Sequence, residues 1–164
     1  MPDWIVYPGG ALGNTSSCGK SLIELHKWGW IKKIPRIAVI NARGANTLHQ
    51  LYNGKFENEE LRWNNGSPNL ELVEKYYKRM SENEELKPKT KATAIQIGMP
   101  ANMTKGIRAL EFTNGVVTEV SDKEMLDGMS AVGLKGFDCE MASGATVDGI
   151  KKLLDNGIMK TDDK

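Results

Sequence analysis

The sequence predicts an α/β fold in three layers, in which helices flank a mostly parallel sheet. Three runs that are mainly apolar, at residues 4–7, 36–41 and 115–120, have the length and the β-branched or aromatic content of buried strands. Segments with the helical spacing of apolar residues lie between these runs. Strands that alternate with helices in this way favour a parallel sheet, because parallel neighbours need a crossover connection.

A helix is expected after the first strand and the turn at residues 8–10. Thr15 or Ser16 is the expected N-cap of this helix, and Gly29 is its expected end. Its apolar stripe consists of Leu22, Ile23, Leu25 and Trp28. After the second strand, residues 44–46 are expected to open a short second helix.

Residues 52–90 differ in character from the rest of the chain. They contain the acidic clusters 57–60 and 82–85 and the polar turn 64–68. One surface helix is expected within them, with an apolar side formed by Leu70, Val73, Tyr76, Tyr77 and Met80. A long polar stretch of this kind is typical of an exposed, mobile excursion from a compact domain.

Regular alternation of helices and strands is expected again in the last part of the chain. A helix over residues 103–112 precedes the third strand, and Ser121 with Glu124 has the pattern of a capping box that starts the next helix. The inward-facing side chains of that helix are expected to be Met125, Leu126 and Met129. We interpret residues 137–140 as a short strand and residues 143–154 as the last helix.

Composition and charge argue against several classes of function. The chain has 164 residues, enough for one compact domain, and 40% of them are hydrophobic and 26% charged. A net charge of +1 gives no reason to expect nucleic-acid binding, and no apolar run approaches the roughly 20 residues of a membrane helix. Cys18 and Cys139 lie far apart, and His26 and His49 have no metal-ligand spacing, so neither a disulfide framework nor a metal site is indicated. We expect a cytoplasmic protein.

The strongest local signal for function is the stretch PGGALGNT at residues 8–15, between the first strand and its helix. Glycines let backbone amides approach an anion, and the following helix adds unpaired amides and the positive end of its dipole. The stretch suits a phosphate monoester, although it is neither the G-x-G-x-x-G dinucleotide pattern nor a Walker motif. A tight strand-to-helix turn without a ligand explains the glycines equally well, so this pattern alone leaves both interpretations open.

Four segments, in the same order, resemble the threonine synthase family. PDWIVYPGGALGN at residues 2–14 is similar to the family pattern P-D-W-[IV]-[VI]-x-P-G-G-N-L-G-N. IPRIAVINA at residues 34–42, with GAN at 44–46, is similar to the next strand and turn of that family. KPKTKATAIQIG at residues 87–98 resembles T-x-A-T-A-I-x-I-G, and CEMASGA at residues 139–145 resembles C-E-P-A-S-A-A. Together they cover most of the chain outside its polar middle.

The resemblance implies part of a fold-type II pyridoxal-phosphate enzyme, related to the tryptophan synthase β chain and threonine dehydratase. The family converts O-phosphohomoserine and water to threonine and phosphate; the cofactor supplies the electron sink and the protein binds and orients it. Matched residue by residue, the contacts to the cofactor phosphate fall on Gly10, Ala11, Leu12, Gly13 and Asn14. The same match places Gly98 close to the ring edge and Glu140 on the ring side.

The chain departs from the family pattern in several places. Ala11 stands where the family has asparagine, and Met141 and Gly144 replace a proline and an alanine. The family's Schiff-base lysine lies upstream of the loop in a serine-phenylalanine-lysine-aspartate segment, and no Phe-Lys-Asp occurs in this chain. The family's last strand, with the hydroxyl partner of the pyridine nitrogen, is expected after Lys164. We therefore interpret residues 1–164 as a C-terminal portion without catalytic residues of its own, inactive alone.

The expected partners are a phosphorylated amino-acid substrate, an N-terminal half of the enzyme as a separate chain, and a second copy in a homodimer. Trp4 and residues 96–98 favour threonine synthase over a threonine or serine dehydratase, a relative that shares the loop and the pattern around Glu140. A non-catalytic phosphate-binding module is a third alternative.

Overall fold

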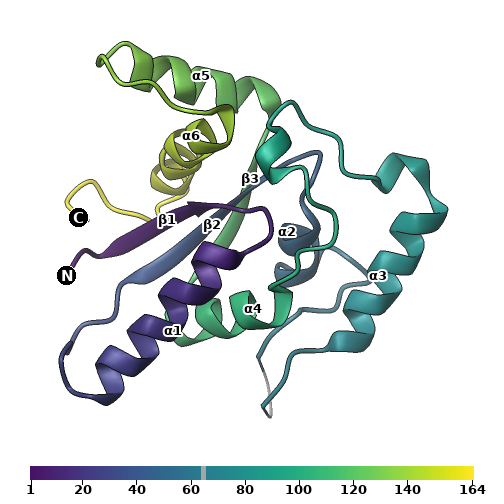
Figure 1. Cartoon of the computed structure of the whole chain (residues 1–164), viewed down its shortest axis with the longest axis horizontal. Coiled ribbons are helices and arrows are strands. Elements are labelled where there is room, and N and C mark those ends of the chain that lie inside the picture. The colour runs from purple at the N-terminus through teal and green to yellow at the C-terminus, as the bar shows by residue number, and fades with distance from the viewer. Residues whose placement is uncertain (64–65) are drawn as a thin grey trace.

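The computed structural model describes residues 1–63 and 66–164 and confirms the three-layered α/β fold (Figure 1). Its three strands form one parallel sheet in the order β1-β2-β3. Their bounds are Trp4–Pro8 for β1, Arg36–Ala42 for β2 and Val116–Val120 for β3. In the register of this sheet, Tyr7 lies opposite Val39, and Val39 lies opposite Val117. The predicted strands at these positions are confirmed.

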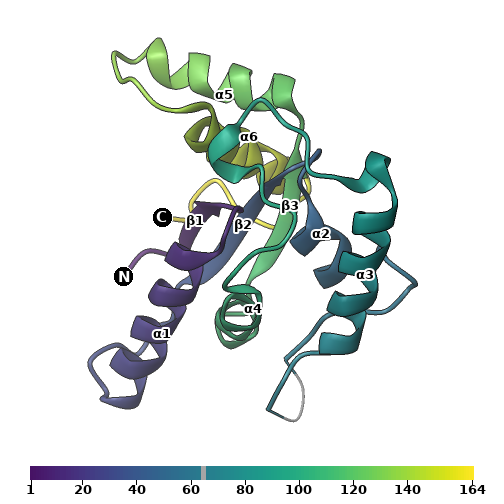
Figure 2. The same ribbon diagram turned by 45° about the vertical axis from the view of Figure 1, so that its right-hand side comes forward.

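Helices cover both faces of the sheet. Their bounds are α1 Gly13–Lys27, α2 Thr47–Tyr52, α3 Leu70–Glu82, α4 Met103–Phe112, α5 Asp122–Gly133 and α6 Met141–Asp155, with 3₁₀ turns η1 at Glu84–Leu86 and η2 at Thr93–Ile95. α1 and α4 lie side by side on one face, whereas α6 lies on the other and α5 packs along α6 (Figures 1 and 2). α2 lies against β3, and α3 lies beside α2. No described helix is long and apolar enough to cross a membrane.

β2 is the central strand and is buried on both of its faces. Ile37 and Val39 belong to the core cluster under α1 and α4, and Ala38 and Ile40 belong to the cluster under α6. All four side chains are fully buried. A strand covered by helices on both faces has no polar side, which explains why its sequence is a continuous apolar run rather than an alternating one.

Residues 52–90 are more than an exposed excursion. Their acidic clusters 57–60 and 82–85 are exposed, but their apolar side chains enter the same core cluster as Ile37. These side chains, each at most 8% exposed, are Tyr52, Phe56, Leu61, Leu72, Val73, Tyr76 and Met80. Leu70, predicted on the apolar side of α3, is 46% exposed at the first position of the helix. Residues 64–65 of the predicted polar turn lie outside the described residues.

Two expectations for the last part of the chain are wrong. Residues 137–140 are not a strand: they join α5 to α6 on the outer side of this helix pair, where no described strand lies alongside, and Phe137 is 70% exposed (Figure 1). Leu126, expected to face inward, is 37% exposed, because α5 is covered by its neighbours along one side only. The capping box of Ser121 and Glu124 is confirmed, and both of its hydrogen bonds are present.

The close contact between α1 and α4 predicts different effects for two glycine-to-alanine substitutions. Gly19→Ala is expected to lower the free energy of unfolding by about 1–3 kcal/mol, because the new methyl group would lie 2.1 Å from the Cβ of Ala109. Gly133→Ala, also in a helix but with nothing within 4 Å of the new Cβ, should leave it unchanged or raise it by up to about 1 kcal/mol. Urea unfolding followed by circular dichroism measures both; equal effects would contradict the close helix contact.

Candidate functional site

The glycine loop connects β1 to α1 at the end of the sheet where the parallel strands finish (Figure 1). Open α/β sheets bind ligands at this end. The loop leads directly into the helix: Gly13 is the first helical residue, and Leu12 is the N-cap, with φ of 63°. The predicted N-cap at Thr15 or Ser16 is therefore wrong, and the helix begins earlier than expected.

Leu12 fixes where the helix begins. Its side chain is 3% exposed and packs on α4 at Gly106, where an added Cβ would lie 3.0 Å from the Cδ1 of Leu12. Burial of this side chain offsets the left-handed backbone conformation, which costs a residue other than glycine roughly 1–2 kcal/mol. Ser16 does not cap the helix, since its hydroxyl donates to the carbonyl oxygen of Gly13 at 2.8 Å. α1 consequently has no side-chain cap, and its first amides stay available to another acceptor.

Six consecutive backbone amides, from Gly10 to Thr15, have no acceptor among the described residues. The amide before them, that of Gly9, donates to the carbonyl oxygen of Ile40 at 2.7 Å. The amide after them, that of Ser16, donates to the carbonyl oxygen of Leu12 at 2.9 Å. The amides of Gly13, Asn14 and Thr15 are donors that any helix start leaves free. The amides of Gly10 to Leu12 extend this run, which marks a place for an anion or ordered water.

The carbonyl oxygens of the same loop, in contrast, are bonded into the protein. The Nδ2 of Asn41 donates to the carbonyl oxygen of Gly9 at 2.8 Å. The carbonyl oxygen of Ala11 accepts from the backbone amide of Asn102 at 3.1 Å and from its Nδ2 at 3.2 Å. Acceptors that would repel an anion are therefore held by protein donors, while the loop's own donors are left free.

Neighbouring groups leave no space for a side chain on Gly9 and little space for one on Gly10. A Cβ on Gly9 would lie 2.4 Å from the Nδ2 of Asn41, and a Cβ on Gly10 would lie 3.3 Å from both the carbonyl oxygen of Ala94 and the Cα of Ile95. η2 thus packs directly on Gly10. The glycine pair follows from these close approaches of the backbone to β2 and η2.

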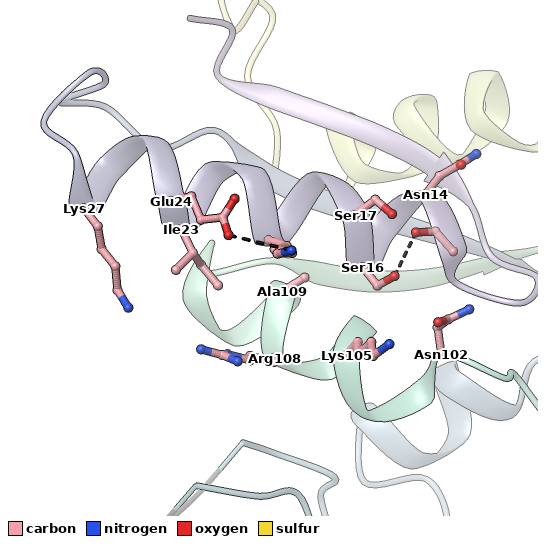
Figure 3. A pocket seen from close by; sticks show the side chains of 12 residues that line it. Asn14, Ser16, Ser17, Ile23, Glu24, Lys27, Asn102, Lys105, Arg108 and Ala109 are labelled. Atoms are coloured by element: carbon pink, nitrogen blue, oxygen red, sulfur yellow. Dashed lines mark hydrogen bonds and ion pairs between the residues drawn. The ribbon is translucent and has the colours of Figure 1, made fainter.

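A groove between α1 and α4 opens beside the loop and has a volume of about 770 Å³. Asn14 and Asn102 lie at one end of this groove and Lys27 lies at the other (Figure 3). Its basic side chains are Lys20, Lys27, Lys105 and Arg108. Glu24 is the one carboxylate among the lining residues and pairs with Lys20 at 3.8 Å. The groove therefore has a positive potential that favours anions next to the loop.

The two predicted site residues outside the loop occupy different surroundings. Gly98 ends the segment that passes Gly10, and its carbonyl oxygen accepts from the hydroxyl of Thr47 at 2.7 Å. A Cβ on Gly98 would lie 2.8 Å from the Sδ of Met80, so this position is closely packed. Glu140 is exposed at the N-cap of α6, and no hydrogen bond or ion pair within the described residues joins it to the loop.

Asn41 and Asn102, which hold the loop, were not among the predicted site residues. The available signal for Asn41 was a polar residue at the end of an apolar strand, because a buried amide needs specific partners. Asn102 offers no comparable signal: it lies in the turn before α4, and Ala11, to which it bonds, is 91 positions away.

The loop fits the phosphate group of pyridoxal phosphate. A phosphate monoester presents three acceptor oxygens and a negative charge. The amides of residues 10–15 supply donors, and the start of α1 with the basic groove supplies positive potential. Ala11 lacks the polar side chain of the family pattern, but backbone donors do not depend on that side chain. The described residues contain no group of three or more side chains suited to hold a metal ion.

The chain is similar to curated proteins that are named threonine synthases. The chain is 26% identical over 164 residues to threonine synthase 2, chloroplastic, of Arabidopsis thaliana, covering all of this chain and 28% of that protein. It is 30% identical over 166 residues to the threonine synthase of Methanocaldococcus jannaschii, covering all of this chain and 35% of that protein. The chain thus spans about a third of the length of the curated relatives it matches.

A solved structure and a family model identify the fold and the family. The crystal structure of a fungal L-serine ammonia-lyase from Rhizomucor miehei superimposes with a TM-score of 0.57 at 17% identity, covering 98% of this chain and 41% of that one. The family model described as pyridoxal-phosphate dependent enzyme matches residues 1–164. The chain belongs to the family of pyridoxal-phosphate dependent enzymes.

Proposed function

We propose that this chain is the part of a threonine synthase that holds the phosphate group of its cofactor. The observation that carries the proposal is the run of free amides from Gly10 to Thr15 beside carbonyl oxygens that are already bonded. The curated relatives described above, named threonine synthases, indicate the reaction, in which O-phosphohomoserine and water give threonine and phosphate.

In this proposal the chain contributes binding and orientation. When bound, pyridoxal phosphate supplies an electron sink for the substrate carbanion. The amides of residues 10–15 hold its phosphate, the start of α1 stabilises the negative charge, and Asn14 at the groove entrance is a further donor. From the family resemblance we propose Gly98 near the ring edge and Glu140 on the ring side; the close packing of Gly98 on Met80 is a separate reason for a glycine at that position.

The other groups that the reaction requires come from polypeptide outside these 164 residues. The relatives are about three times as long as the matched segment, and the lysine that forms a Schiff base belongs to a motif that this sequence does not contain. We place that motif on further polypeptide, either continuous with this chain or a separate N-terminal half. The substrate is a phosphorylated amino acid, and the assembled enzyme is a homodimer in the cytoplasm.

A dehydratase is the second candidate, since the ammonia-lyase from Rhizomucor miehei has the same fold. At 17% identity, the likeness to that ammonia-lyase indicates the fold only. The relatives with higher identity are named threonine synthases. The two activities differ in substrate and product: a synthase releases inorganic phosphate from O-phosphohomoserine, and a dehydratase releases ammonia from threonine or serine.

A charge introduced at the loop should separate ligand binding from stability. Asn14→Asp is expected to raise the Kd for pyridoxine 5′-phosphate about tenfold or more, because the new carboxylate repels the phosphate. The same substitution should raise the free energy of unfolding by about 0.3–1 kcal/mol, since a negative charge is favourable at a helix N-terminus. Calorimetric titration and urea unfolding measure the two effects. Pyridoxine 5′-phosphate has no aldehyde, so lysines cannot bind it covalently.

Two further variants identify the cause of a changed affinity. Asn14→Ser removes the amide side chain without adding a charge, and Ser130→Asp adds the same charge to an exposed position of α5. Ser130→Asp is expected to keep the affinity of the unmodified chain, and Asn14→Ser, which retains a hydroxyl donor, is expected to weaken binding by less than Asn14→Asp does. If Asn14→Asp also binds pyridoxine 5′-phosphate as the unmodified chain does, the phosphate site is not at this loop.

Complementation tests the reaction itself. The chain, combined with a polypeptide from the same genome that carries the serine-phenylalanine-lysine-aspartate motif, is expected to release phosphate from O-phosphohomoserine and to form threonine. Introducing Asn14→Asp should lower this rate at a limiting cofactor concentration by about tenfold, in proportion to the weaker binding of the cofactor phosphate. Ammonia release from threonine without phosphate release would establish the dehydratase instead. Cofactor binding with neither activity would leave a phosphate-binding module.

A further inference from the structure

We propose that Asn41 is a positioning residue for the phosphate loop: it locks the peptide between Gly9 and Gly10 in the orientation that directs the Gly10 amide toward the ligand. This inference rests on the proposed function of the loop and names a residue that acts on the ligand without touching it.

Asn41 joins the loop to the start of α2 through a single side chain. It is 2% exposed; its Nδ2 donates to the carbonyl oxygen of Gly9 at 2.8 Å, and its Oδ1 accepts from the backbone amide of His49 at 2.9 Å. The first partner can only accept and the second can only donate, so the orientation of the side-chain amide is determined. With both atoms occupied and the residue buried, Asn41 has no group left for a ligand.

The geometry of a peptide explains how this bond orients the loop. In a trans peptide the carbonyl oxygen of Gly9 and the amide hydrogen of Gly10 lie in one plane and point in opposite directions. When Asn41 holds the oxygen, the Gly10 amide must point away from β2. A peptide between two glycines meets little steric resistance to rotation, because neither residue has a Cβ. The bond from Asn41 therefore supplies an orientation that the loop sequence itself leaves undetermined.

The packing around Gly9 supports the same conclusion. Its amide donates to the carbonyl oxygen of Ile40 at 2.7 Å, so both backbone polar groups of Gly9 are held by β2. A Cβ on Gly9 would lie 2.4 Å from the Nδ2 of Asn41 and 2.8 Å from the Cγ1 of Val39. The free amides begin with the next residue, which makes Gly9 the last fixed point before the ligand site.

Ionisable groups near Asn41 can also change ligand affinity with pH, so their contribution must be separated from that of Asn41. The side chain of His49 is 16% exposed, and its Nδ1 lies 3.4 Å from the Oε2 of Glu119. Burial lowers the pKa of His49, the nearby cations Lys55, Lys152 and Arg43 lower it further, and the carboxylate of Glu119 opposes this shift. The Nε of Arg43 also lies 3.4 Å from the Oε1 of Glu119. A pH experiment on Asn41 therefore needs a background in which His49 does not titrate.

The test uses Asn41→Asp, which keeps the shape of the side chain and removes one donor. At about pH 8 the carboxylate faces the Gly9 carbonyl oxygen, and the Kd for pyridoxine 5′-phosphate is expected to rise about tenfold relative to the unmodified chain. As the pH is lowered to about 5.5, the buried carboxyl group takes up a proton and donates again, so the ratio of the two Kd values should return toward one. The ligand phosphate, whose second pKa is about 6, titrates over the same range, but its effect on the two Kd values cancels in their ratio.

Matched variants exclude a general effect of lost stability. In Asn53→Asp the same substitution removes a similar bond, from Nδ2 to the carbonyl oxygen of Val117 at 3.0 Å, away from the loop, and ligand affinity should not change. Asn41→Ala removes the donor without adding a charge, so binding should be about tenfold weaker at every pH. It also keeps the test decisive if the aspartate variant does not fold. The ratio measured for Asn41→Asp should be the same in a His49→Gln background.

Each outcome assigns the failure to one of the two proposals. If the unmodified chain binds pyridoxine 5′-phosphate and Asn41→Asp binds it equally well at about pH 8, Asn41 does not position the loop. A loss of affinity that acid does not reverse, or that Asn53→Asp shares, also overturns the inference. If the unmodified chain binds no pyridoxine 5′-phosphate, the loop is not the phosphate site, and the proposed function fails independently of Asn41.

Discussion

Hydrogen bonds to the carbonyl oxygens of the glycine loop are the interactions on which the candidate site depends. A peptide chain has equal numbers of donors and acceptors, except at proline, so it favours an anion only where its acceptors are turned away. Here Asn41 and Asn102 hold the oxygens of Gly9 and Ala11, and the amides of residues 10–15 are left without partners in the described part of the chain. In the proposed function, selectivity for an anion therefore depends on the two asparagines that hold the carbonyl oxygens of the loop.

The two asparagines are held in place by different elements of the fold, β2 and α4. Asn41 is the penultimate residue of the central strand, which is buried between two layers of helices. Asn102 precedes α4, whose position against α1 is fixed by the contact between Gly19 and Ala109. Leu12 completes the arrangement by packing on α4 while it starts α1. The core packing and the ligand site therefore share the same residues.

The structure also shows how the loop keeps its free amides despite a departure from the family pattern. The family's asparagine in the loop is Ala11 here, but the donors are backbone amides and the oxygen of Ala11 is held from outside by Asn102. A side chain at this position can add to recognition of a ligand without being required for the phosphate grip. In the proposed function, the loop contributes binding and the chemistry of the cofactor depends on groups outside this chain.

The sequence by itself determined the features that depend on neighbouring residues. The three apolar runs that form the sheet and the capping box at Ser121 are local patterns of apolar spacing and hydrogen bonding, and these predictions are confirmed. The glycine loop was located for the same reason. Local patterns failed at residues 137–140, because a strand needs a neighbour that the local sequence does not specify. They also failed at the start of α1, because the conformation of Leu12 there depends on its contact with Gly106 of α4, which is distant in the sequence.

Tertiary structure alone decided which backbone groups of the loop are bonded within the protein and which are left free. The bond from Asn41 to Gly9 spans 32 positions and that from Asn102 to Ala11 spans 91, so neither can be inferred from residues next to the glycines. Tertiary packing likewise decided that the apolar side chains of residues 52–90 join the main core. Sequence located the glycine loop between β1 and α1. The folded chain oriented its peptides, because only long-range contacts can fix the direction of a peptide between glycines.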